Sequence, residues 1–238
     1  MALPDAATLA ELARTPLFGI GLTIGAYAVG LRLNRWSGGL PATNPALIAV
    51  LLVGLAITLL GIPHAAYMVG AGAVYFLLGP AVVLLAVPLL RQARLIRASR
   101  GLVACALIVG IGSGLAASLG LAWLFGASWG TILALAPKSV TVGAAIGVAE
   151  LLGTIPSLTA ALVVMTGLTG GVAGATVARW VGARDERAVG LALGIASQGF
   201  GTARALRIGP VAGAFAGLGM GLDSVITALL LGGLAWMH

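Results

Sequence analysis

Charged residues are the scarcest class in this sequence. They make up 8% of its 238 residues, whereas soluble domains carry about 25%. Hydrophobic residues make up 60%, and the mean hydropathy is +1.13. A water-soluble fold cannot hide that much apolar surface at this chain length. The composition therefore excludes an ordinary soluble protein and predicts that lipid surrounds most of the chain.

Cysteine and histidine are also rare, and each absence removes a class of function. The single cysteine, Cys105, cannot form a disulfide within the chain, and its place in an apolar run predicts a small packing residue. The two histidines, His64 and His238, provide no metal cluster. The chain has no nucleophile elbow and no phosphate-binding lysine motif. We therefore expect no enzyme, no metal site, no cofactor and no ATP-driven pump.

Basic residues outnumber acidic ones and cluster between the apolar runs. The net charge is +7 and the pI is near 11, which in a soluble protein would suggest nucleic-acid binding. Arginines placed between apolar runs are instead typical of the positive-inside rule of membrane proteins. Arg32, Arg35 and the segment "RQARLIRASR" (91–100) are therefore expected in the cytoplasm. The N-terminal segment (1–15), which lacks the pattern of a cleavable signal peptide, is expected outside.

The apolar residues form eight runs, each close to the roughly 20 residues that a membrane-spanning helix needs. The runs are 16–33, 44–62, 68–90, 101–125, 128–151, 156–178, 188–207 and 210–236. The connections between them are short. We therefore predict an all-α polytopic membrane protein with a single integral-membrane domain (1–238), placed in the bacterial inner membrane.

The later arginines do not fit eight simple crossings. The groups at 179–187 and 204–207 both favour the cytoplasmic side, yet only the run 188–207 lies between them. Either the runs 128–151 and 188–207 are broken or re-entrant hairpins, or the group at 179–187 faces outward. Helix breakers inside both runs favour the hairpins. Non-helical backbone survives at membrane depth only where protein or water satisfies its polar groups.

A weak internal repeat raises the possibility of the inverted-repeat architecture of secondary transporters. The segment "NPALIAVLLVGLAITLLGIP" (44–63) is similar to "APKSVTVGAAIGVAELLGTIP" (136–156) in its early proline and its closing Leu-Leu-Gly and Ile-Pro. Two short matches in an apolar chain also arise by chance, so both interpretations stay open.

Glycines recur at a spacing of four, which places small residues on one helical face and allows close helix packing. The sets are Gly213, Gly217 and Gly221; Gly170 and Gly174; and Gly110 and Gly114. Such faces serve either static packing or sliding between helices. We expect them to hold a homodimer.

The first break in an apolar run is "LAPKSVT" (135–141). Pro137 removes a backbone donor, so a new helix is expected to start within the membrane. The positive end of a helix dipole attracts anions, and Lys138, Ser139 and Thr141 add a cation and two hydroxyl donors there.

The second break is "ASQGFGTARAL" (196–206). Its glycines loosen the backbone, and its donors are Ser197, Gln198, Thr202 and Arg204. Two donor-rich breaks are typical of a site for a small anion, most simply a carboxylate. The alternative is that Lys138 and Arg204 extend to the two membrane surfaces.

Two acidic residues complete the set of intramembrane ionisable groups. Asp223 lies in the middle of an apolar run, where an unpaired charge is costly. It is either the partner of Lys138 or Arg204 in a buried ion pair, or a coupling-ion or proton site. Glu150 lies at the end of its run and is either interfacial or part of the same ion-pair system.

Several motifs resemble the LrgB/CidB family, which includes YohK-like proteins and is related to the plastidal glycolate/glycerate translocator. They are "NPALIAVLLV", "FLLGPAVVLLAVPLLRQ", "LAPKSVT", "GTIPSLTA", "VGLALGIASQGFGTARAL" and "GAFAGLGMGL". The resemblance implies holin-like or antiholin-like control of murein hydrolase export, or transport of glycolate, glycerate or pyruvate. It also implies a small membrane partner of the LrgA/CidA type.

The resemblance also implies a set of important residues: Asn44, Pro45, Gly79, Pro80, Pro137, Lys138, Ser139, Ser197, Gly201, Thr202 and Arg204. The sequence departs from the family pattern at Gln198, where histidine is common, at Val142 and Gly143, where a threonine-proline pair is common, and at Asp223, where a small residue is usual. The missing histidine weakens any proton relay through position 198.

The sequence thus predicts a secondary transporter of small organic monocarboxylates. The alternative is a holin-like regulator of murein hydrolase export and autolysis. The two differ in that a transporter is saturable and selective, whereas a holin acts through large assemblies with little selectivity.

Overall fold

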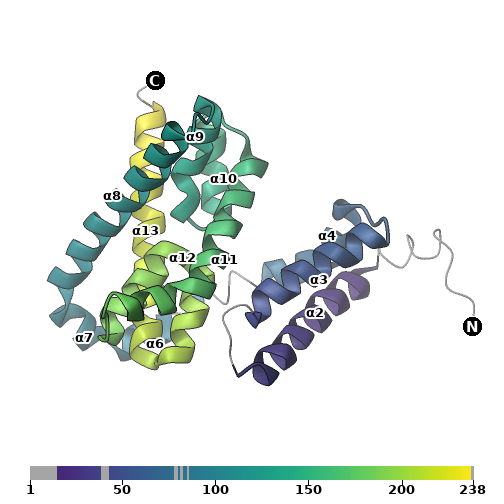
Figure 1. Ribbon diagram of the computed structural model, residues 1–238, viewed down its shortest axis with the longest axis horizontal. Coiled ribbons are helices and arrows are strands. Elements are labelled where there is room, and N and C mark those ends of the chain that lie inside the picture. Colours follow the sequence, from purple (N-terminus) through teal and green to yellow (C-terminus); the bar gives the residue numbers. More distant parts are fainter. Residues whose placement is uncertain (1–14, 39–42, 78–79, 81–82, 85, 237–238) are drawn as a thin grey trace, which may run out of the picture. The chain divides into compact units, whose positions relative to one another are not determined.

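The computed structural model describes residues 15–38, 43–77, 80, 83–84 and 86–236. Within these ranges the regular structure is entirely helical (Figure 1), as the sequence predicts. The expected extracytoplasmic segment, 1–15, lies outside the described residues except at Thr15. The chain divides into two compact units, 1–84 and 85–238, and each is considered by itself.

The first unit consists of α2 (Pro16–Trp36), α3 (Pro45–Leu59) and α4 (His64–Phe76), with α2 packed against the other two. Two glycines of α2 allow close approach: a β-carbon at Gly30 would lie within 3.2 Å of the backbone of Pro45, and Gly19 faces α4 in the same way. Asn44 begins α3, because its side-chain oxygen accepts a hydrogen bond from the backbone N–H of Ala46 at 2.9 Å.

The second unit begins with two short helices, α6 (Ala86–Arg91) and α7 (Ala93–Ala98). Three long helices and two interrupted segments follow. They are α8 (Arg100–Leu124), α9 (Trp129–Leu135), the 3₁₀ turn η2 (Ala136–Ser139), α10 (Val142–Leu151), α11 (Pro156–Trp180), α12 (Glu186–Ile208) and α13 (Pro210–Trp236).

Four described helices are long and apolar enough to cross a membrane: α2, α8, α11 and α13. The helices α3 and α10 are apolar but shorter. The expectation of one span over 68–90 is not confirmed, because α4 ends at Phe76, α6 begins at Ala86, and residues 78–79, 81–82 and 85 lie outside the described residues. The eight apolar runs are therefore not eight equivalent spans.

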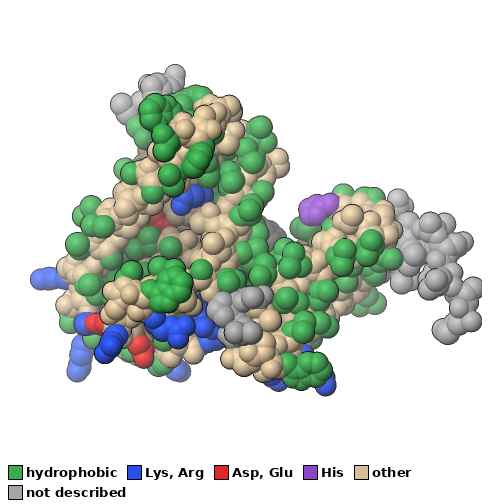
Figure 2. All heavy atoms as spheres, in the orientation of Figure 1, with side chains coloured by type: hydrophobic (Ala, Val, Ile, Leu, Met, Phe, Trp, Pro, Cys, Tyr) green, Lys and Arg blue, Asp and Glu red, His purple; other side chains and the backbone are tan. Residues whose placement is uncertain are grey.

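Tryptophan marks the ends of these helices. Four of the five tryptophans lie at or next to the last residue of α2, α8, α11 and α13, and the fifth begins α9. Their exposure in the isolated chain is typical of the aromatic belts at the two surfaces of a bilayer. Hydrophobic side chains cover much of the surface between them (Figure 2). Cys105 lies on this exposed surface of α8, so the expectation that it packs inside the fold is wrong.

Helix α12 folds back on itself at Gln198. The backbone of Gln198 has φ 49° and ψ −129°, and a β-carbon at Gly201 would lie within 2.7 Å of the carbonyl carbon of Leu193. A β-carbon at Gly209 would lie 2.7 Å from the carboxylate of Glu186, although a straight helix of this length would separate its ends by about 34 Å. The segment 186–208 is therefore a helical hairpin.

The segment 129–151 is also interrupted and also returns to the end from which it came. Pro137 departs from helical geometry, and Val140 and Thr141 are extended before α10 begins. One apolar cluster contains both Leu119, near the end of α8, and Leu152, just after α10. Helix α9 packs against α8, and Figure 1 shows α9 near the end of α8. We call residues 136–141 the first tip and residues 197–199 the second tip.

The α12 hairpin brings the arginine groups of the second unit to one end. Arg187 donates a hydrogen bond from Nη1 to the Ser99 hydroxyl at 3.1 Å, which joins the start of α12 to the start of α8. Arg187 also donates from Nε to the Asp185 carboxylate at 3.0 Å. The hydrogen bonds from Arg187 hold the pKa of the exposed Asp185 carboxyl below its usual range. Lys and Arg side chains gather at this end in Figure 2. The hairpins therefore remove the conflict among the arginine groups that eight simple crossings create.

The closest packing in the second unit joins the first half of α12 to α13. A β-carbon at Gly190 would lie within 3.0 Å of the backbone of Ala212, and one at Gly194 within 2.8 Å of the backbone of Ala216. Both pairs repeat every four residues, as in small-residue interfaces of membrane helices.

Most of the four-spaced glycines are used for packing within the chain. Gly174 faces Leu193, Gly110 faces Ile195 and Gly213 faces Leu206, while Gly217 is buried. The structure thus gives these faces a role in folding, and the homodimer remains a prediction that they do not support.

The weak sequence repeat gains no support from the fold. Residues 45–59 form one uninterrupted helix, whereas the matching segment 136–156 contains the first tip and the shorter helix α10. The shared proline begins a helix in the first segment and breaks one in the second.

We predict that Gly194→Ala lowers the thermal stability of the purified protein. Alanine normally stabilises a helix interior by about 0.5–1 kcal/mol relative to glycine, but here its β-carbon meets backbone that cannot move aside, and overpacking costs about 1–3 kcal/mol. The matched control is Gly112→Ala, which faces open space on α8. Thermal unfolding in detergent should show a loss only for Gly194→Ala, and equal stability of the two variants would contradict the close α12–α13 contact.

Candidate functional site

Buried polar side chains are concentrated around the two tips. Outside this region the second unit is largely apolar, and Ser99 and Thr159 are its other buried polar residues among those described. The buried polar side chains of the second tip and the adjoining part of α13 are Ser197, Gln198, Thr202, Asp223 and Thr227. Because burial of a polar group is costly unless it is hydrogen-bonded, their concentration in one place indicates a site.

One hydrogen bond joins the two tips directly. The side-chain amide of Gln198 donates from Nε2 to the backbone carbonyl of Lys138 at 2.8 Å. The break at Pro137 leaves carbonyls without helical partners, so the amide satisfies a group that the first tip exposes. The two breaks therefore form one structure, although 60 residues separate them in the sequence.

Asp223 lies near the middle of α13 and is fully buried. Thr227, one turn later, donates to Asp223 Oδ1 at 2.8 Å. The other oxygen, Oδ2, has no hydrogen bond of good geometry from a described residue, although the Ser139 hydroxyl is near. Lys138 acts on this carboxylate through its charge without forming a direct ion pair. The Ser139 hydroxyl thus brings the first tip close to this carboxylate.

The first tip presents the start of α10 to the interior. Thr141 precedes α10 but its side chain does not cap the helix, and its backbone N–H donates instead to the hydroxyl of Ser224 on α13 at 3.3 Å. The second half of α12 also starts at a tip, after Gln198. Helix starts carry partial positive charge and free N–H groups, so two such ends lie at the tips.

The second tip is held by Thr202 and by close contact with α11. Thr202 donates to the backbone carbonyl of Gln198 at 2.9 Å and contacts the sulfur of Met220 at 3.8 Å. The Ser197 hydroxyl is buried without a hydrogen-bond partner among the described residues. It lies where a β-carbon at Gly170 would sit.

The structure brings together most of the predicted site residues but not all. Pro137, Lys138, Ser139, Thr141, Ser197, Gln198, Thr202 and Asp223 belong to the tips or contact them. Arg204 is half-buried six residues beyond Gln198, and no described hydrogen bond or ion pair joins it to the first tip. Glu150 is exposed at the far end of α10.

The family resemblance also implies four residues of the first unit, Asn44, Pro45, Gly79 and Pro80. Asn44 begins α3 in the first unit, where its side chain has a structural partner. Gly79 lies outside the described residues. The assignment of Asn44 to the substrate site remains a prediction.

Sequence reasoning missed Ser224, Thr227 and Met220, which all lie on α13. Thr227 could have been found, because it is four residues from Asp223 and therefore on the same helical face. Ser224 and Met220 carry no such signal, since only the tertiary packing brings Thr141 and Thr202 to them.

The polar side chains at the tips are of the kinds that can bind a small charged ligand. They comprise one ammonium group, one carboxylate, several hydroxyls and one amide. The described part of the chain contains no group of three or more His, Cys, Asp or Glu residues that would hold a metal ion.

These features define a class: a multi-pass helical membrane protein with two folded-back segments that meet at buried polar residues. The chain belongs to the LrgB-like family, which matches residues 23–237.

Relatives of this family span most of the chain. It is 33% identical to the Bacillus subtilis protein YxaC over 86% of this chain and 89% of that protein. It is 32% identical to proteins named holin-like protein CidB in Staphylococcus epidermidis and Staphylococcus aureus, over 88% of this chain and 91% of each relative. No solved structure shows a significant match.

We predict that Gln198→Gly is more stable than Gln198→Ala. Both variants lose the hydrogen bond from the side-chain amide to the Lys138 carbonyl. Only the alanine variant keeps a β-carbon in a backbone conformation that favours glycine, where strain costs about 1–3 kcal/mol. The matched control is Ala192, exposed in the first half of α12, where Ala192→Gly should be the destabilising change. Thermal unfolding of the purified variants measures both orders. If Gln198→Ala is the more stable of the pair, the fold-back at position 198 is wrong.

Proposed function

We propose that this protein is a secondary transporter of small organic monocarboxylates such as glycolate, glycerate or pyruvate. The observation that carries the proposal is the meeting of two helix breaks at buried polar groups, through Gln198 and the Lys138 carbonyl. Broken helices that meet at the membrane midplane are a general feature of transporter sites. Their irregular backbone is tolerated where it lines a cavity or contacts protein.

Lys138 is the residue assigned to the substrate carboxylate. It is the only lysine among the 238 residues, it is half-buried, and it lies beside the uncapped start of α10. An ammonium group, hydroxyl donors and a helix start all favour an anion. Ser139 and Thr141 supply the hydroxyls of the first tip, and Ser197 supplies a buried hydroxyl at the second tip.

Asp223 is the counter-charge of this site. A lysine in an apolar interior needs a compensating negative charge, and the Asp223 carboxylate is close enough to act on Lys138 without a direct ion pair. When substrate binds, its carboxylate takes over this role. Asp223 is then the group at which a coupling ion or proton would compensate the extra charge.

The environment proposed for the protein follows from its charges. The arginine-rich end of the second unit faces the cytoplasm of a bacterial inner membrane, with the N-terminus outside. A homo-oligomer and a small partner of the LrgA/CidA type belong to the same proposal.

A holin-like role is the second candidate, because the CidB relatives carry that name. In that role the protein would alter envelope permeability and autolysis through large assemblies. The buried polar tips offer less support for it, because a nonselective opening does not need a specific set of donors at mid-membrane depth.

Reconstituted vesicles separate the two candidates. Purified protein should take up labelled glycolate, glycerate or pyruvate under an ion gradient, with saturation and with discrimination between stereoisomers of glycerate. Leakage of unrelated solutes of similar size should stay at the level of empty vesicles. Uptake that neither saturates nor discriminates, accompanied by general leakage, would favour the holin-like role.

Lys138→Ala tests the assignment of the site. The change removes a charge-assisted contact worth roughly 1.5–3 kcal/mol and should weaken apparent substrate affinity about ten- to a hundredfold. Lys138→Arg should recover activity in part, since a guanidinium group is larger and needs planar acceptors. Uptake kinetics and thermal unfolding without substrate are measured together.

The double variant Lys138→Ala with Asp223→Ala separates a substrate site from a structural charge pair. If the pair is only structural, the double variant should recover stability and uptake together. If Lys138 binds substrate, stability recovers at most and uptake stays lost. Lys138→Ala protein that folds normally and transports carboxylates with unchanged affinity would rule out the substrate site.

A further inference from the structure

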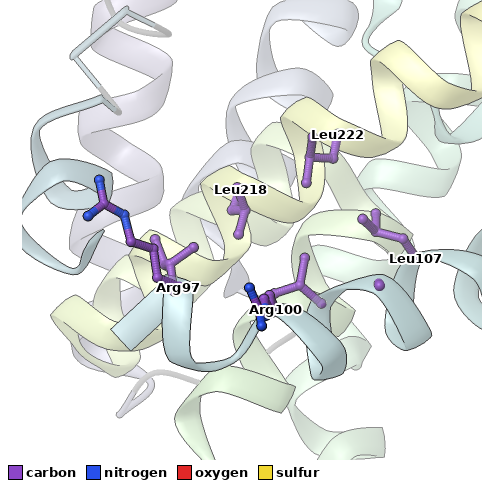
Figure 3. A pocket seen from close by; sticks show the side chains of 8 residues that line it. Arg97, Arg100, Leu107, Leu218 and Leu222 are labelled. Carbon is purple, nitrogen blue, oxygen red and sulfur yellow. The ribbon is translucent and has the colours of Figure 1, made fainter. Parts of the chain in front are cut away.

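A groove with a different lining from that of the tips lies at the arginine-rich end of the second unit. It is formed by α7, the first two turns of α8 and the middle of α13, and its volume is about 520 Å³. Its lining residues are Ile96, Arg97, Arg100, Val103, Ala104, Leu107, Leu218 and Leu222 (Figure 3). All of them belong to the second unit, and two of them are cationic.

The two cations of the groove are free to bind a ligand. Arg97 and Arg100 are exposed, and neither has a hydrogen bond or ion pair with another described residue. This differs from Arg187, at the same end of the unit, which is held by Asp185 and Ser99. The lining contains no acidic residue, so the two guanidinium groups give this mouth of the groove an uncompensated positive charge.

The rest of the groove is apolar and runs into the membrane. From Arg100 the lining continues along α8 through Val103 to Leu107, a rise of about 10 Å. Leu218 and Leu222 of α13 form the facing wall and pack against the same apolar cluster. A ligand that fits this surface is anionic at one end and hydrocarbon along the other.

We propose that this groove binds an anionic phospholipid, with its phosphate at Arg97 and Arg100 and an acyl chain along Leu107, Leu218 and Leu222. Arginine pairs phosphate oxygens in a planar, bidentate way. Basic pockets between membrane helices on the cytoplasmic side are suited to anionic headgroups. A zwitterionic lipid fits less well, because its headgroup brings a cation to the two arginines.

A lipid in this groove would also support the binding site. Leu218 and Leu222 lie on one face of α13, while Met220, between them, contacts Thr202 of the second tip, and Asp223 follows Leu222 directly. An acyl chain packed on Leu218 and Leu222 therefore contacts the same helix, α13, that carries Asp223.

The test compares two arginine pairs in the same segment. The detergent-purified protein is titrated with dioleoyl phosphatidylglycerol and, separately, with dioleoyl phosphatidylcholine. Native mass spectrometry measures the fraction of protein that carries bound lipid. The variant Arg97→Gln with Arg100→Gln should bind phosphatidylglycerol about thirtyfold more weakly, since each surface arginine contributes a roughly fivefold effect. The control Arg91→Gln with Arg94→Gln removes the same charge from outside the groove and should bind as the wild type does.

A second measurement, of thermal stability, distinguishes a loss of lipid binding from misfolding of the variant. Phosphatidylglycerol should raise the melting temperature of the wild type and of the control pair but not that of Arg97→Gln with Arg100→Gln. The pair Arg97→Lys with Arg100→Lys keeps both charges and should retain most of the binding.

Three results would overturn the proposal. One is an equal loss of binding in both glutamine pairs, which would mean a diffuse basic surface. Another is a wild type that does not prefer phosphatidylglycerol to phosphatidylcholine. The third is a photo-cross-link from benzophenone attached to Ala104→Cys, in a Cys105→Ala background, to another segment or a second copy, because protein would then fill the groove.

Discussion

Backbone hydrogen bonding inside an apolar solvent is the constraint on which this structure depends. In lipid, a carbonyl or N–H group that loses its helical partner has no water to replace it. Both tips lose such partners. At the first tip, the Lys138 carbonyl accepts from the Gln198 amide of the second tip, and the N–H of Thr141 donates to the Ser224 hydroxyl of α13. The two breaks are stable because they are built against each other and against α13.

This mutual dependence explains where the unusual residues of the chain lie. Gln198 is the one described non-glycine residue with a positive φ, and strained backbone of this kind persists only where its surroundings hold it. Small residues provide that support, since Gly190 and Gly194 bring α12 against α13. The same helix α13 then carries the buried carboxylate of Asp223 on one face and the wall of the arginine-bearing groove on another.

The sequence predicts the helical class, the membrane location and the family, because these depend on composition and on local motifs. It also predicts both breaks, since Pro137 and the glycines around Gln198 act on the backbone locally. Its weaker predictions depended on long-range packing. Residues 68–90 are not confirmed as one span, Cys105 is exposed, and most of the four-spaced glycines pack inside the chain, while the homodimer remains a prediction.

What the sequence by itself determined is which residues are out of place in lipid: one lysine, one mid-helix aspartate and two interrupted runs. What only the tertiary structure decided is that the lysine, the aspartate and the two breaks belong together, while Glu150 is exposed at the far end of α10 and Arg204 has no described bond to the first tip. The physical reason is that a break in a helix is a local property of the chain. The hydrogen-bond partners of the backbone groups freed by the break depend on packing between segments that lie 60 or more residues apart.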